Sequence, residues 1–280
     1  MEINLSNAST SISPVDKPLP PPPPPPPPPL SPSSSPPPSV SHLPPLGFIS
    51  VDVHFPRPPG DPFNEQTWPF PLVREQAQGS QLHQIVTKDG YTADFVDRFV
   101  EAGQRLIARG CVGIITSCGF LAMAQPELAK RLSVPVATSA LIQIPSVHAL
   151  LPPTQSVGII TFDASKLGAL HLSQLLIGDV DRLHIIGVPE DGELGRMVRD
   201  GAAYVHERIE EELIQCARDL VERYPDIGAL VLECTQMPPF ARAIQEAVHL
   251  PVYDVYTMGM WFYSGLVRRT PHAWSVTNQS

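Results

Sequence analysis

From Leu46 onward, short apolar runs rich in β-branched residues alternate with longer amphipathic stretches. The apolar runs predict strands at 47–53, 112–117, 136–139, 157–162, 183–188, 229–233 and 252–255. Between them, the stretches 93–108 and 205–221 place apolar side chains at helical spacing, so that each predicts a helix with one buried face. Strands that alternate with helices in this way are typical of βα units around a parallel sheet, and we therefore expect an α/β fold.

A weak internal repeat divides these elements into two halves. The segment Val112-Gly-Ile-Ile-Thr-Ser-Cys118 and the segment Gly228-Ala-Leu-Val-Leu-Glu-Cys234 each read as a strand that ends in a cysteine. A proline follows each cysteine at the same separation, Pro135 in the first half and Pro251 in the second. The repeat predicts two pseudo-symmetric parallel-sheet α/β lobes, 46–151 and 152–250, with the active site in the cleft between them. We expect the strand and helix within 251–280 to pack back on the first lobe.

Residues 1–45 differ from the rest of the chain because they consist largely of Pro and Ser, with an unbroken proline run at 20–29. Such a segment cannot bury enough apolar surface to offset the entropy of ordering it, so we expect a disordered tail. Proline-rich chains are also ligands for SH3 or WW domains, and that interpretation stays open. The chain shows no secretory signal and no apolar run long enough to span a bilayer, which favours a cytoplasmic protein.

The charge and the cysteine spacing narrow the classes of partner. The net charge of −9 argues against binding to nucleic acid or to an anionic membrane surface, because both need clustered Lys and Arg. A small-molecule partner is expected instead. The four cysteines form no CxxC pair and lie in no His-rich pattern, so neither a metal site nor a disulfide framework is predicted.

Cys118 and Cys234 are the candidate catalytic residues because each lies where a predicted strand ends and a helix begins. Ligands of parallel sheets bind beyond these carboxyl ends of the strands. The backbone N–H groups of Gly119 and Phe120, and of Thr235 and Gln236, are expected to bind a substrate carboxylate and to lower the thiol pKa values toward neutrality. Two such cysteines on opposite sides of one carbon suit a two-base proton transfer.

Other polar residues near these strand ends complete the predicted site. Ser117, Thr116 and Thr235 are candidate donors to the carboxylate, and Thr138 is expected to line the cleft. Arg57 is expected to bind a carboxylate by a bidentate contact, or else to be a solvated surface charge. Asn64 is a further candidate, with turn formation as its alternative role. Cys111 and Cys216 are expected to be structural, and Glu233 is given no catalytic role.

The motifs resemble those of the aspartate/glutamate racemase superfamily, which includes amino-acid and hydantoin racemases, maleate isomerases and arylmalonate decarboxylases. The resemblance rests on Thr116-Ser-Cys-Gly-Phe120, Glu233-Cys-Thr-Gln-Met-Pro-Pro239, and Phe55-Pro-Arg-Pro-Pro-Gly-Asp61 with Asn64. It implies an enzyme without cofactor or metal, in which Cys118 and Cys234 are the acid/base pair, and it makes a homodimer an expectation. Family racemases usually have Asn and Thr after the first cysteine, and the Gly119-Phe120 pair found here favours a bulkier or less polar carboxylate.

The sequence therefore predicts a cofactor-independent isomerase, a racemase or epimerase of a small carboxylate such as an amino acid or its derivative. Decarboxylation or cis–trans isomerisation of a small dicarboxylate on the same fold is the first alternative. A two-lobed protein that binds a ligand without chemistry is the second, because the fold alone does not determine the function.

Overall fold

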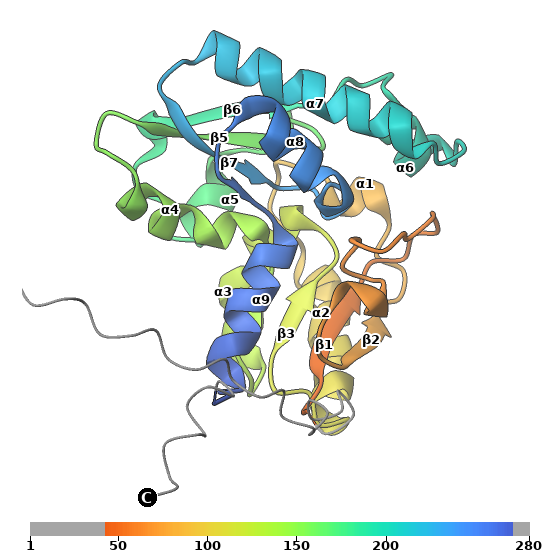
Figure 1. Cartoon of the computed structure of the whole chain (residues 1–280). Helices are drawn as coiled ribbons and strands as arrows, with labels where there is room; N and C mark the ends of the chain where they lie inside the picture. Colours follow the sequence, from red (N-terminus) through yellow and green to blue (C-terminus); the bar gives the residue numbers. More distant parts are fainter. Residues whose placement is uncertain (1–42, 271–280) are drawn as a thin grey trace, which may run out of the picture. The chain divides into compact units, whose positions relative to one another are not determined.

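The computed structural model describes residues 43–270. The disordered tail and its binding to SH3 or WW domains were both predicted for residues 1–45, nearly all of which lie outside this range. Two four-stranded parallel sheets are present within it (Figure 1). The first consists of β1 (Leu46–Ser50), β2 (Leu72–Gln76), β3 (Ile114–Thr116) and β4 (Val136–Ala137), and the second of β5 (Ser156–Thr161), β6 (Leu183–Gly187), β7 (Ile227–Leu232) and β8 (Val252–Tyr253).

The two sheets share one topology. Their strand orders are β2-β1-β3-β4 and β6-β5-β7-β8, so each strand of the first sheet has a counterpart four strands later in the chain. The central pairs match as well, with Phe48 opposite Ile115 in the first sheet and Ile159 opposite Val231 in the second. The predicted fold class, two pseudo-symmetric parallel-sheet α/β lobes, is therefore confirmed.

Helices connect the strands, as parallel pairing requires. Their bounds are α1 (Leu82–Ile85), α2 (Ala93–Ala108), α3 (Gln125–Arg131), α4 (Ile144–Leu150), α5 (Ala169–Gln174), α6 (Glu193–Asp200), α7 (His206–Arg223), α8 (Ala241–Val248) and α9 (Val255–Leu266). Helix α2 begins at Thr92, whose hydroxyl accepts the N–H of Phe95. Its apolar face, which includes Phe99 and Leu106, is fully buried, and α7 buries Leu213 and Leu220 in the same way. None of the helices described in residues 43–270 is long and apolar enough to cross a membrane.

The C-terminal strand and helix separate from each other. Strand β8 pairs with β7 in the second sheet, where the repeat places the counterpart of β4, and so differs from the expectation that it packs on the first lobe. Helix α9 lies against the first lobe, where Met258 and Tyr263 share an apolar cluster with Phe48 and Trp68. The Tyr263 hydroxyl also donates a hydrogen bond of 2.6 Å to the carbonyl of Pro44.

Two glycines of α9 give a matched test of this packing. A Cβ on Gly259 would collide with the Trp68 ring, whereas a Cβ on Gly265 would meet nothing within 4 Å. The Trp68 indole cannot move away freely because its Nε1 donates to the carbonyl of Pro62 at 2.9 Å. We expect Gly259→Ala to lower the free energy of unfolding by about 1–3 kcal/mol. Gly265→Ala should raise it by about 0.5–1 kcal/mol, because alanine is the better helix former.

Urea unfolding followed by circular dichroism measures both effects. Equal stability of the two variants would contradict the packing of α9 against Trp68.

Candidate active site

Cys118 and Cys234 line the same cavity. Cys118 follows β3 and precedes a 3₁₀ helix at Gly119–Ala124, and Cys234 follows β7, the counterpart of β3. The cavity has a volume of about 20 Å³, roughly the space of one water. It is lined by Leu82, Val86, Cys118, Gly119, Phe120, Phe162, Val198, Glu233, Cys234, Thr235 and Gln236. A substrate therefore enters only after some of these surrounding segments move apart.

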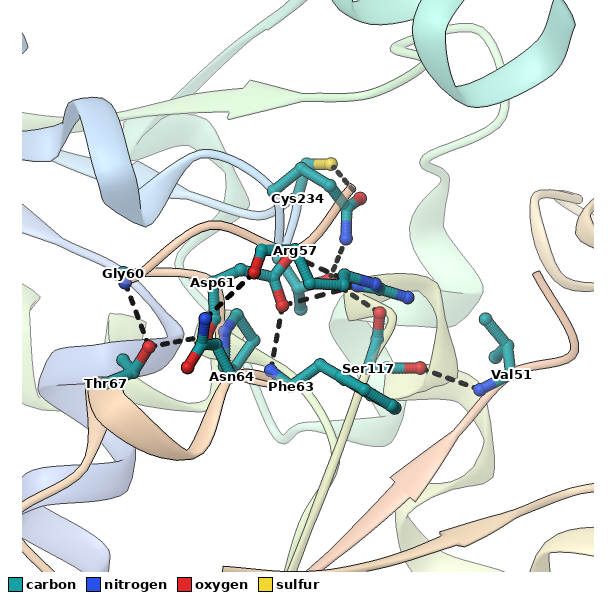
Figure 2. Close-up of polar contacts among 12 residues, drawn as sticks. Val51, Arg57, Gly60, Asp61, Phe63, Asn64, Thr67, Ser117 and Cys234 are labelled. Carbon is teal, nitrogen blue, oxygen red and sulfur yellow. Dashed lines mark hydrogen bonds and ion pairs between the residues drawn. The ribbon is translucent and has the colours of Figure 1, made fainter. Parts of the chain in front are cut away.

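A chain of hydrogen bonds joins the two lobes beside the cavity. The Thr235 hydroxyl donates to the carbonyl of Ser117 at 2.5 Å, and Gln236 Nε2 donates to the Thr235 hydroxyl at 3.0 Å. The Cys234 thiol donates to Gln236 Oε1 at 3.2 Å, so its proton has a defined acceptor. Ser117 is itself held to the first sheet because its hydroxyl accepts the N–H of Val51 at 2.8 Å (Figure 2).

Both thiols are protonated in this closed arrangement. Burial raises the pKa of Cys118 and of Cys234 above the ordinary thiol value, and the Glu233 carboxylate raises both further. The N–H groups of Phe120 and Leu121 act in the opposite direction on Cys118. The prediction that the helix ends bring the thiol pKa values toward neutrality is therefore wrong here, because desolvation and a neighbouring negative charge outweigh a few N–H dipoles.

Glu233, to which the sequence analysis gave no catalytic role, lines the cavity of the two cysteines. Its Oε2 accepts the Thr161 hydroxyl at 2.7 Å and the N–H of Phe162 at 3.3 Å, whereas its Oε1 is buried without a hydrogen-bond partner. Burial raises the pKa of this carboxyl to about 7. A signal was present in the sequence, because Glu233 directly follows the apolar buried strand β7, and a buried carboxylate is rarely found without a function or a partner.

Tyr91 was also missed. Its hydroxyl donates to the carbonyl of Ile85 and to the carbonyl of Phe120, both at 2.9 Å. These bonds tie α1, which contributes Leu82 to the cavity wall, to the turn that follows Cys118. Tyr91 thus holds together two segments of the first lobe that border the cavity.

Arg57 and Asn64 lie outside the residues that line this cavity. The guanidinium of Arg57 contacts the buried Asp61 at 3.2 Å and lies over the Phe55 ring, 4.0 Å from its centroid. Asn64 folds the loop, because its Nδ2 donates to the carbonyl of Arg57 at 2.9 Å (Figure 2). Its Oδ1 accepts the N–H of Gln66 at 2.9 Å. The structure thus brings these residues together as a loop that lies against the site.

The hydroxyls of Thr116 and Thr138 are engaged within the first lobe. Thr116 donates to the carbonyl of Thr138 at 2.6 Å, and Thr138 donates to Gln125 Oε1 at 2.9 Å. Neither residue lines the cavity. Ser117 does not line it either, and its hydroxyl accepts the N–H of Val51, which follows β1. Of the predicted binding residues, Gly119, Phe120, Thr235 and Gln236 are therefore the ones that the structure places at the cysteines.

No model of a known protein family matches the chain. A dimethylsulfoniopropionate lyase from Durusdinium sp. clade D is 28% identical over 226 residues, which cover 79% of this chain and 75% of that protein. Dimethylsulfoniopropionate lyase 5 from Emiliania huxleyi (strain CCMP1516) is 28% identical over 77% of this chain but only 44% of its own length. These relatives are named as lyases, so the predicted racemase activity, and with it the assignment as an isomerase, is wrong.

Two solved structures have a fold similar to that of this chain. Unliganded arylmalonate decarboxylase superposes with a TM-score of 0.54 at 15% identity, over 80% of this chain and 92% of that one. An aspartate racemase homologue from Pyrococcus horikoshii OT3 superposes with a TM-score of 0.50 at 14% identity, over 80% and 99% of the two chains. The repeated parallel sheets with a cysteine after β3 and after β7 thus have the fold of the aspartate/glutamate/hydantoin racemase superfamily.

Proposed function

We propose that this protein is a lyase that cleaves dimethylsulfoniopropionate or a closely related sulfonium carboxylate. Two cysteines that line one small cavity carry the proposal, because they provide a proton-transfer group beside a bound carboxylic acid derivative. The names of the curated relatives support this choice of substrate. The fold is compatible with it, since it places both cysteines at the carboxyl ends of parallel strands.

The proposed reaction is a β-elimination. A base removes a proton from the carbon next to the carboxylate, and the electron pair of that C–H bond forms a double bond to the neighbouring carbon. The bond from that carbon to sulfur breaks, and its electrons convert the sulfonium into neutral dimethyl sulfide, which leaves acrylate. The leaving group takes no proton, so one base is enough. A racemase needs a second group to return a proton from the opposite face, and this reaction does not.

We assign the role of base to Cys118. The N–H groups of Phe120 and Leu121 favour its thiolate, because their hydrogen bonds to the sulfur lower its pKa. Cys234 keeps its proton in the assigned arrangement, because its thiol donates to Gln236 Oε1. Cys234 therefore stays a thiol during the proposed proton removal, and Cys118 acts as the one base.

The test is an assay of the purified full chain with dimethylsulfoniopropionate. Gas chromatography of the headspace measures dimethyl sulfide, and proton NMR measures acrylate in the same sample. We expect the two products in equal amounts. A folded protein that forms neither product, from this substrate or from its diethyl and methyl-ethyl sulfonium homologues, would overturn the proposal.

A further inference from the structure

We propose that Glu233 is the counter-ion of the substrate cation, with its buried, unpartnered Oε1 placed in an apolar cavity to bind a sulfonium group. This inference rests on the proposed lyase function, because it names the part of the site that recognises the substrate's positive charge. It also extends that function, since the same site should bind other small carboxylates that carry a methylated onium group.

The carboxylate of Glu233 is fixed in position but incompletely satisfied. The bonds from Thr161 and Phe162 both go to Oε2, and Oε1 has no partner although it is buried. Leaving a buried carboxylate oxygen without a partner is unfavourable, so a group that binds there gains a strong contact. Because Glu233 lines the cavity of the cysteines, a bound substrate is in a position to supply that group.

Gly119 makes room for this carboxylate. A Cβ at Gly119 would collide with Oε1 of Glu233 and with its main-chain carbonyl. The residue after Cys118 therefore has no side chain, and Glu233 approaches the first lobe closely. The carboxylate and the Cys118 turn are in this way brought to the same side of the cavity.

The part of the chain that the structure describes supplies no ion-pair partner for Glu233. Among residues 43–270, no Lys, Arg or His forms an ion pair with it. Two arginines beside residues of the site have other partners. Arg57 is paired with Asp61, and Arg199 lies over the Phe162 ring, 5.1 Å from its centroid. In our proposal, the positive charge at Oε1 is that of the substrate.

The rest of the cavity wall suits a methylated cation. Leu82, Val86 and Val198 provide aliphatic surface, and Phe120 and Phe162 provide aromatic rings. Methyl groups on a sulfonium or a quaternary ammonium cannot donate conventional hydrogen bonds, so they are recognised by apolar contact, by aromatic rings and by a nearby anion. An ordinary ammonium ion would lose its hydration here without gaining enough acceptors.

Cation binding at Glu233 also links recognition to catalysis. The ionised carboxylate raises the pKa of Cys118 and of Cys234, and it acts on Tyr91 as well. Arg57 opposes this effect at Cys118, while Asp61 adds to it at Cys234. A sulfonium beside Glu233 offsets the negative charge and so removes one of the two causes that raise the pKa of Cys118, the larger cause being burial.

The experiment compares two ligands of the same shape. 3-(Trimethylammonio)propanoate has the cation, and 4,4-dimethylpentanoate has a neutral tert-butyl group in its place; neither contains a carbon–sulfur bond. Isothermal titration calorimetry of the full chain should show at least about tenfold tighter binding of 3-(trimethylammonio)propanoate than of 4,4-dimethylpentanoate. Glu233→Gln should remove this preference without weakening the binding of 4,4-dimethylpentanoate. Glu246→Gln, a change at an exposed position of α8 that does not line the cavity, should leave the preference intact.

The pH dependence provides a second measurement that needs no variant. Burial raises the pKa of Glu233 to about 7, and only its ionised form attracts a cation. The preference should therefore grow as the pH rises from 6 to 8. Below pH 7 the cation should displace up to about one proton, measured from the binding enthalpy in buffers of different ionisation enthalpy. 4,4-Dimethylpentanoate, which lacks the cationic group, should displace no proton.

The outcomes separate this inference from the proposed function. A charge preference that persists in Glu233→Gln, or wild-type protein that binds neither ligand or both equally, would overturn the role of Glu233. A preference that depends on Glu233 in a protein that releases no dimethyl sulfide would support the counter-ion and refute the lyase. Should Glu233→Gln fail to fold, the proton displacement in the wild type decides the matter.

Discussion

Cys118→Ala is expected to reduce the release of dimethyl sulfide by about 100- to 10,000-fold, the usual contribution of a positioned general base. The alanine removes the group that accepts the proton from the carbon next to the carboxylate. Binding should change little, because Glu233 and the apolar wall remain. The loss should therefore appear in kcat rather than in KM, as measured by headspace chromatography over a range of substrate concentrations.

Cys111 and Cys216 provide the matched controls. Both are free and buried, but neither lines the cavity of Cys118 and Cys234. Cys111→Ala and Cys216→Ala should keep kcat within about twofold while lowering the free energy of unfolding by about 1 kcal/mol, as expected for removing one buried apolar atom. If Cys118→Ala retained full activity, or if the Cys111 variant lost as much, Cys118 would not be the base.

Gly119→Ala is the second change expected to have a large effect. The new methyl group would meet both the side chain and the main-chain carbonyl of Glu233, and the carbonyl cannot rotate away. The Cys118 turn and the end of β7 must then move apart. We expect the free energy of unfolding to fall by about 1–3 kcal/mol, as is typical when a packed site is overfilled.

The activity of Gly119→Ala should fall by at least about 100-fold, because small displacements of a base from its substrate are costly. Gly178→Ala is the control, since a Cβ at Gly178 would meet nothing within 4 Å. Thermal unfolding and dimethyl sulfide release measure both properties in the two proteins. A fully active Gly119→Ala would show that close contact between Glu233 and the Cys118 turn is unnecessary.

Our proposal gives this fold a reaction that differs from racemisation, and the chemistry of the leaving group explains how one fold could carry out both. A racemase must remove a proton on one face and return one on the other, so both cysteines change protonation state. A sulfonium leaves as a neutral sulfide and needs no proton. A site for elimination is therefore able to keep one thiol protonated, as Cys234 is through Gln236. Such a site needs an anion for the substrate cation, which Glu233 provides in our proposal.

The sequence determined the architecture because its signals are local and periodic. Apolar runs and helical spacing predicted the two lobes, and the bounds of α2 match the predicted 93–108. The repeat predicted that Cys118 and Cys234 occupy equivalent positions. Strand β2 was missed because its segment, Leu72–Gln76, carries Arg74 and Glu75 and is only half-buried at the edge of the sheet.

Only the tertiary structure decided which side chains face the cavity and in what state of protonation. Spacing alone did not show that Glu233 points toward Gly119, or that Thr116 and Thr138 bond to their own lobe. The thiol pKa values depend on burial and on one carboxylate from a neighbouring position, both of which result from packing. Periodicity is a property of a segment, whereas desolvation and charge proximity are properties of segments brought together, and so they emerge only when the lobes are assembled.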